Sequence, residues 1–173
     1  MNVENEYMEL LKSWCDGLIG LQFKEENNPR LDGGIFCPSC MMIHGRCHDA
    51  IYPMMVLADR FNEEKYLTAA KRLFQWSENL LCDDGSYYND AQNDWAGITV
   101  FSVIALTHAL EFHASLLSEQ EKELWEARLY RTAEWVFQTI TPQFDVNINY
   151  HAACAEAMAL TGTYFQREKY LRR

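Results

Sequence analysis

Residues 31–49 concentrate side chains that can bind a metal or take part in catalysis. Four of them carry thiol or imidazole groups, which are ligands that zinc takes in tetrahedral sites. These four are Cys37, Cys40, His44 and Cys47. A second cysteine pair at a familiar spacing is absent, so packed thiols and a loop disulfide stay open as alternatives. The pattern requires no cofactor but allows a structural zinc at these four residues.

Two aspartates, Asp49 and Asp94, occupy matching places just before two apolar segments of the chain. Glycoside hydrolysis uses one carboxyl group as the acid and a second as the base or nucleophile. We therefore interpret Asp49 and Asp94 as a catalytic pair. Aspartates at helix starts are also common N-caps, so capping alone stays open as the alternative for each.

Side chains that suit a sugar ligand lie beside these two aspartates. Arg46 can hold a substrate carboxylate through two parallel hydrogen bonds, although an ion pair with a neighbouring aspartate is the alternative. Trp95 offers a flat aromatic face of the kind that packs on sugar rings, although any one aromatic residue can equally be part of the core. We add His48 to this group of expected substrate-binding residues.

A third cluster lies at residues 147–151. Elimination across a uronic acid needs a neutral polar group against the carboxylate and a tyrosine or histidine to move the proton. The cluster supplies those residue types, and capping and packing are the alternative roles. Its expected substrate-binding residues are Asn147, Asn149, Tyr150 and His151.

The elements that must position these residues are predicted to be helices throughout. Apolar residues recurring at three- and four-residue steps predict amphipathic helices at residues 4–21, 63–81 and 118–140. Nearly continuous apolar segments predict buried helices at residues 50–61, 97–110 and 150–160. Three local signals accompany these ranges: Asn62 as a possible N-cap, Ser118 with Glu121 as a capping box, and Gly162 as a helix stop.

The connections between the predicted helices alternate in length. Long polar loops at residues 31–49, 83–96 and 141–149 lead into the apolar helices, whereas short connections lead out of them. We expect the first of these loops to lack secondary structure. In antiparallel hairpins, loops of one kind emerge at one end. We therefore expect the three polar loops to gather on a single face around Asp49, Trp95 and Tyr150.

A sequence repeat supports an array of hairpins. Glu64-Lys-Tyr-Leu67 and Glu168-Lys-Tyr-Leu171 lie 104 residues apart, which is twice 52. Periods of this size are typical of toroids, solenoids and arrays of helical hairpins.

Three motifs that each enter an apolar helix, at residues 44–50, 94–99 and 147–152, give the chain a family resemblance. The chain resembles the six-hairpin glycosidase-like superfamily, which includes glycoside hydrolases and the helical domains of polysaccharide lyases. The resemblance implies an all-α fold of alternating inner and outer helical hairpins, a partial (α/α)6 toroid. Residues 1–173 would form one such domain of about two and a half hairpins plus an N-terminal helix. We expect a fragment of a longer toroid whose exposed flanks self-associate.

Bulk properties restrict the partners. The 173 residues carry a formal charge of −10, and 49% of them are hydrophobic. This acidity argues against nucleic acid and anionic membranes as partners, since both require clustered Lys and Arg. The acidic start lacks the pattern of a secretory signal, and the longest apolar run, at residues 95–106, is short for a membrane span, so we expect a cytoplasmic protein.

Together these observations predict a carbohydrate-active enzyme with an oligosaccharide or polysaccharide substrate. The leading interpretation is a glycoside hydrolase with paired carboxylates. Two alternatives stay open: a uronate-type polysaccharide lyase that uses Tyr, His and Asn, and a non-catalytic helical-repeat module in which the Cys and His residues form a structural clip.

Overall fold

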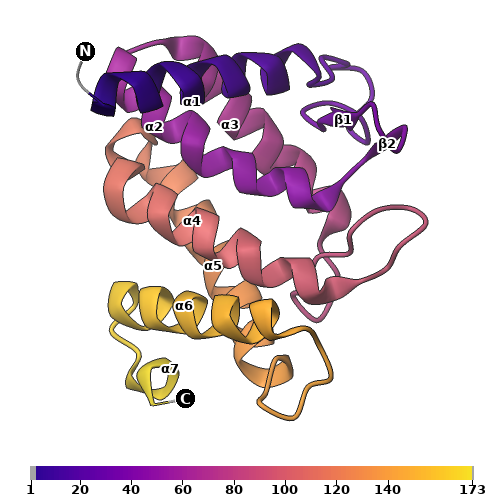
Figure 1. Ribbon diagram of the computed structural model, residues 1–173, viewed down its shortest axis with the longest axis vertical. Helices are drawn as coiled ribbons and strands as arrows, with labels where there is room; N and C mark the ends of the chain where they lie inside the picture. The colour runs from indigo at the N-terminus through magenta and orange to yellow at the C-terminus, as the bar shows by residue number, and fades with distance from the viewer. Residues whose placement is uncertain (1–2, 173) are drawn as a thin grey trace.

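The computed structural model describes residues 3–172, and its helices stack from α1 at one end to α6 and α7 at the other (Figure 1). The expected all-α class is confirmed. The α-helices are α1 (Val3–Gly20), α2 (Ile51–Phe61), α3 (Glu64–Trp76), α4 (Thr99–His113), α5 (Glu119–Thr139), α6 (Ile148–Tyr164) and α7 (Glu168–Leu171). Short 3-10 helices are η1 (Gly45–Ala50), η2 (Ser77–Leu80), η3 (Ala96–Ile98) and η4 (Ala114–Leu116).

Helix α4 lies at the centre of the core. It packs against α2, α5 and α6, and most of its residues are buried, which explains why its sequence is apolar on every side. The segment Ala96–Leu116 is long and apolar enough, by length and composition alone, to cross a membrane. However, 61% of the 18-residue apolar stretch within this segment is buried inside the structure, so packing in the core accounts for its composition.

Helix α5 begins where the sequence predicts. Ser118 and Glu121 form the expected capping box, in which each side chain bonds to the backbone of the other residue. Further along the helix, the buried Arg128 donates to the Phe74 carbonyl at 2.7 Å and to the Ser77 hydroxyl at 3.0 Å. These bonds connect α5 to the last turn of α3.

Two helix boundaries differ from the sequence prediction. Asn62 adopts a left-handed conformation (φ 52°) and ends α2, whereas the N-cap of α3 is Glu63. Gly162 does not stop α6, which continues to Tyr164. A Cβ at Gly162 would lie 2.7 Å from Leu171, so this glycine allows α7 to pack closely on α6.

Residues 31–49 are not structureless, contrary to the expectation. They contain a two-stranded antiparallel hairpin of β1 (Phe36–Cys37) and β2 (Met42–Ile43). The stretch packs closely on α3. Gly33 lies so near this helix that an added Cβ would come within 2.2 Å of the Arg72 carbonyl oxygen. The hairpin then leads through η1 into α2.

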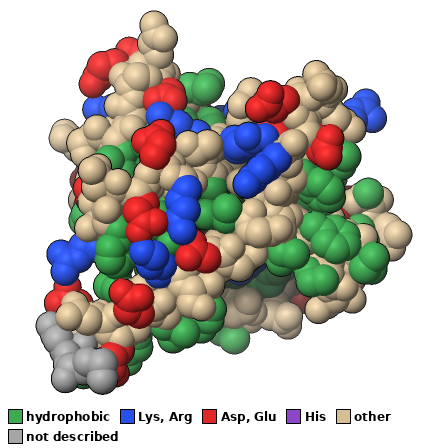
Figure 2. Space-filling model, turned by 90° about the horizontal axis from the view of Figure 1, so that it is seen from above, with side chains coloured by type: hydrophobic (Ala, Val, Ile, Leu, Met, Phe, Trp, Pro, Cys, Tyr) green, Lys and Arg blue, Asp and Glu red, His purple; other side chains and the backbone are tan. Residues whose placement is uncertain are grey.

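Helix α1 covers α2 and α3 with only one of its faces. Cys15 is buried and Leu11 and Leu18 pack against the core, whereas Tyr7 and Trp14 are 69% and 62% exposed. Part of the apolar stripe read from the sequence therefore points outward. Figure 2, which views the molecule from the α1 end, shows acidic and basic side chains interspersed over this face with hydrophobic patches between them.

Candidate functional site

The three polar loops gather at one side of the stack, around the N-terminal ends of α2, α4 and α6 (Figure 1). The Gly45 amide donates to the Asn89 carbonyl at 2.5 Å, which joins the loops before α2 and α4. The Trp95 indole N–H donates to the Tyr150 hydroxyl at 2.9 Å, which joins the loop before α4 to α6. Side chains that are far apart in the sequence thus meet along one rim.

Arg46 occupies the middle of this rim. Its guanidinium carbon lies 3.8 Å from the centre of the Phe101 ring, and Phe101 in turn contacts Tyr150 edge to face at 5.5 Å. The guanidinium also lies 3.1 Å from a carboxylate oxygen of Asp49, which is the ion pair that the sequence left open as an alternative. With its side chain 44% exposed, Arg46 can still contact a ligand from solvent.

Asp49 lies in η1, one turn after Arg46, and is half-buried. Burial raises the pKa of its carboxyl group to about 7, although the charge of Arg46 works in the opposite direction. One of its carboxylate oxygens is buried without a hydrogen-bond partner among the described residues. Asp49 is not the N-cap of α2, which is Ala50, so it has no capping role there.

Trp95 and Tyr150 form the aromatic part of the rim. Besides its hydrogen bond, the Trp95 ring lies edge to face with Tyr150 at 5.5 Å and stacks against Phe144 at 6.2 Å. The indole ring lies directly over Gly97, where an added Cβ would come within 2.4 Å of it. The absence of a side chain at Gly97 therefore lets the Trp95 ring occupy this position.

The other predicted residues of the third cluster lie apart from Tyr150. Asn147 is the N-cap residue of α6 but makes no side-chain capping bond, and both it and Asn149 are exposed. His151 lines an apolar groove along α6 together with Ile148. The structure therefore brings Tyr150 to the rim but turns His151 toward a different face.

Asp94 and Asp90 lie in the same loop in different surroundings. Asp94 is exposed and lines a hollow at the tip of the loop. Asp90 is buried, and its carboxylate accepts from the Gln92 amide at 2.9 Å and from the Asn89 side chain at 2.7 Å. Nothing in the sequence distinguishes Asp90 from Asp94, because the burial of Asp90 depends on how the loop folds against residues 44–45.

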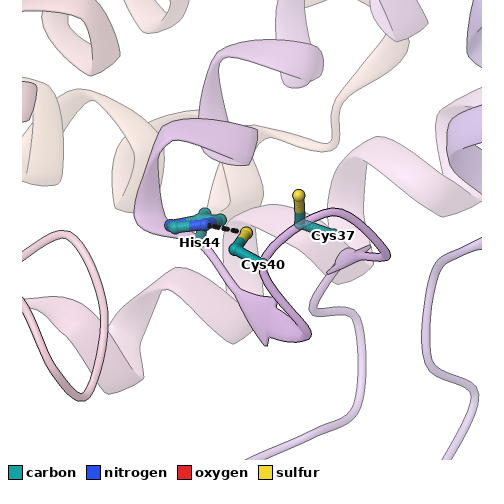
Figure 3. Close-up of side chains that lie close together, drawn as sticks. All are labelled: Cys37, Cys40 and His44. Carbon is teal, nitrogen blue, oxygen red and sulfur yellow. Dashed lines mark hydrogen bonds between the residues drawn. The ribbon is translucent and has the colours of Figure 1, made fainter.

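Three potential metal ligands lie together on the hairpin. The ligand atoms of Cys37, Cys40 and His44 all lie within 4.8 Å of one another. Figure 3 shows Cys40 and His44 facing each other. The Cys40 sulfur lies 2.6 Å from the His44 Nε2. Hydrogen bonding by the Cys40 side chain, followed by the amides of Cys40 and Ser39, lowers the pKa of the Cys37 thiol.

Cys47 lies beside this group. It lines a hollow of about 460 Å³ together with Cys37, His44, Arg46 and Asn89. Burial, and then the neighbouring Cys37, raise the pKa of the Cys47 thiol to about 11. Three of the four residues that the sequence marked as potential zinc ligands thus line this hollow, and the sulfur of the fourth, Cys40, lies within 4.8 Å of the ligand atoms of Cys37 and His44.

His48, in contrast, is part of the core. It is 1% exposed, its ring packs against Tyr87 at a centroid distance of 5.2 Å, and burial lowers its pKa to about 3. Its imidazole is therefore neutral at physiological pH. In this conformation the side chain does not reach the rim.

Comparisons with known proteins were made for the whole chain. Residues 11–173 match the family model described as the ulvan lyase N-terminal domain. The chain is also 37% identical, over 164 residues, to a broad-specificity ulvan lyase of Formosa agariphila. That alignment covers 94% of this chain and 26% of the relative, so the chain spans about a quarter of the relative's length. No solved structure matches the chain significantly.

Proposed function

Because the chain belongs to the ulvan lyase N-terminal domain family, we propose that it supplies part of the substrate site of a polysaccharide lyase that acts on an ulvan-type acidic polysaccharide. The family corrects the leading interpretation from the sequence. Glycoside hydrolase, and hydrolase in general, is the wrong class, and the alternative of a polysaccharide lyase is better supported. Asp49 and Asp94 stay predicted site residues, without the hydrolytic roles first given to them.

A lyase has to solve two problems at a uronate. A base removes the proton beside the sugar carboxylate, the bond to the leaving oxygen on the next carbon breaks, a carbon–carbon double bond forms, and the leaving oxygen takes up a proton. Negative charge develops on the carboxylate during proton removal, so a positive or neutral polar group must face it. A side chain that can release and accept a proton must lie within hydrogen-bond reach of the reacting carbon.

The observation that supports this proposal is the continuous contact from Arg46 through Phe101 to Tyr150 and Trp95. In our proposal Arg46 binds the uronate carboxylate and Tyr150 transfers the proton. The Trp95 indole donates to the phenolic oxygen, and a donor there stabilises negative charge that develops on that oxygen. The exposed part of Trp95 supplies a flat surface for a neighbouring sugar.

The test is to replace Tyr150 by Phe in the full chain and to measure elimination by the ultraviolet absorbance of the unsaturated product. Loss of the proton-transfer group should lower kcat by at least about 100-fold with little change in the melting temperature. The matched control is Tyr164→Phe. Tyr164 lies at the opposite end of α6, where its hydroxyl donates to Glu126 at 2.7 Å. Unchanged turnover by Tyr150→Phe, or saturated products from the parent protein, would contradict the proposal.

The proposal also includes the architecture: the chain forms an arc of an (α/α) toroid. Helices α2, α4 and α6 each follow a long loop at the rim, and the two ends of the stack carry exposed apolar residues such as Trp14 on α1 and Ile148 on α6. An arc of an (α/α) toroid would leave its first and last helices open in this way. We expect the substrate to lie across the N-terminal ends of α2, α4 and α6.

A further inference from the structure

The hairpin before α2 has a geometry that suits a bound metal ion. Tetrahedral zinc with Zn–S bonds of about 2.3 Å holds its ligands about 3.8 Å apart. The ligand atoms of Cys37, Cys40 and His44 already lie within 4.8 Å of one another. We propose that these three residues and Cys47 bind one structural Zn²⁺, which has no part in the elimination chemistry and does not depend on it.

The backbone holds the first two ligands in place. Cys37 is the last residue of β1 and pairs with Met42 of β2, and Cys40 lies in the turn between the strands. The turn closes through Met41, a non-glycine residue at φ 57°. Two cysteines separated by two residues on such a hairpin present both sulfurs to one side, as half of a zinc site requires.

His44 has a partner that fits a metal-bound imidazole. Its Nε2 faces the Cys40 sulfur, while its Nδ1 lies 3.1 Å from a carboxylate oxygen of the buried Asp90. Histidine ligands usually donate their second ring N–H to a carboxylate or carbonyl, which fixes the tautomer and the ring orientation. A disulfide between Cys37 and Cys40 would give no role to an imidazole held in this way.

Cys47 completes the set of four. It follows His44 by three residues, within η1, and borders the same hollow as Cys37 and His44. Three thiolates and one imidazole around Zn²⁺ leave a net charge of −1. The Arg46 guanidinium borders the same hollow and can offset that charge.

The consequence of such a site would be to fix the loops relative to each other. The metal would connect the hairpin to η1, and His44 would connect it to Asp90 in the loop before α4. Arg46 lies between two of the proposed ligands, His44 and Cys47. Zinc would therefore hold in place the segment that carries Arg46.

The first experiment measures metal content in the full chain, purified under reducing conditions without chelators. We expect one zinc per chain by elemental analysis, and binding of Co²⁺ to the metal-free protein with thiolate-to-metal charge-transfer bands. Cys37→Ser, Cys40→Ser and Cys47→Ser should each lower those bands by about a third and weaken zinc binding by at least tenfold. The control is Cys82→Ser, whose half-buried thiol lies outside the cluster.

The second experiment separates a positioning role from general stability. Asp90→Asn should weaken zinc binding by about 10- to 100-fold, the usual effect of removing the partner of a histidine ligand, while one zinc still binds at saturation. Asp94→Asn, in the same loop but exposed, should leave the affinity unchanged. The proposal is overturned if the folded parent protein binds neither Zn²⁺ nor Co²⁺, or if mass spectrometry shows Cys37 and Cys40 joined as a disulfide.

Discussion

Arg46 and Asp49 show how neighbours decide what a side chain can do. Their spacing of three residues in η1 brings the charges to 3.1 Å, yet the pKa of Asp49 is still raised, because the effect of burial exceeds that of the nearby cation. A carboxyl group that titrates near neutral pH at the rim can exchange a proton with a ligand. Asp49 therefore stays a predicted site residue, beside the Arg46 that we propose binds the substrate.

The raised pKa of Asp49 has a consequence for stability. An aspartate in the unfolded chain titrates near pH 3.9, whereas the folded value is about 7. Between these values the folded state keeps a proton that the unfolded state has lost, so this group's stabilising contribution falls as the pH rises and is lost above about pH 7. Asp49→Asn cannot ionise. The free energy of unfolding of this variant should equal that of the parent near pH 4 and exceed it by at most about 4 kcal/mol near pH 8.

Urea unfolding at the two pH values measures this difference. Asp94→Asn, the same substitution at an exposed position of the rim, serves as the control. A stability difference for Asp49→Asn that is the same at both pH values would show that the carboxyl group titrates normally.

Some site residues could be found from the sequence and others could not. Trp95, Tyr150 and Arg46 are recognisable because each stands beside the predicted start of an apolar helix. Phe101 was missed, because in sequence it is one more apolar residue of a helix that is apolar throughout, and only the packing of α6 shows that it joins Arg46 to Tyr150. Asp90 was missed because its burial depends on contacts with a distant loop.

At the scale of elements, the helices were predictable and the hairpin was not. The amphipathic helices show a clear 3.6-residue pattern, and the buried helices α4 and α6 show as long apolar runs in the sequence. The capping box at Ser118 predicted the start of α5. Strands of two residues, as in β1 and β2, are too short to show any alternation. Asn62 was assigned to the wrong helix end for a different reason. Asparagine suits both the end of one helix and the start of the next, and the sequence does not show which role it takes.

The docking of residues 31–49 on α3 should depend on Gly33. Its φ of 89° is unfavourable for other residues, and a Cβ there would lie 2.2 Å from a backbone oxygen of α3 that cannot move independently. Gly33→Ala should lower the free energy of unfolding by at least about 2 kcal/mol, measured by chemical denaturation.

Gly17 provides the matched comparison. It lies in α1 with nothing within 4 Å of a Cβ, so Gly17→Ala should raise stability by up to about 1 kcal/mol through helix propensity alone. Equal effects of the two substitutions would mean that the contact between Gly33 and α3 does not form.

At the scale of the whole molecule, α1 and α6 lie towards opposite ends of the stack (Figure 1), and each carries an apolar surface. One is the outer face of α1, with Tyr7 and Trp14. The other is the groove of about 540 Å³ along α6, next to which Ile148 is 81% exposed. Exposed surfaces of this kind favour association, and the two differ from each other, so copies of the chain should associate head to tail.

Sedimentation velocity over a range of concentrations tests this expectation. Ile148→Asp should weaken self-association by at least tenfold, because a charge in the apolar groove loses its hydration when a second copy covers it. Leu124→Asp, on the exposed side of α5, should have no such effect. A parent chain that stays monomeric at high concentration would contradict the prediction.

The bond between the Gly45 amide and the Asn89 carbonyl has a consequence for how the rim can vary. Both atoms belong to the main chain, so exchanging side chains on either loop leaves this link in place. Gly45 itself is the exception, because a Cβ there would lie 2.7 Å from the Tyr88 carbonyl oxygen. The side chains around this point can thus be exchanged while the two loops keep the same relative position.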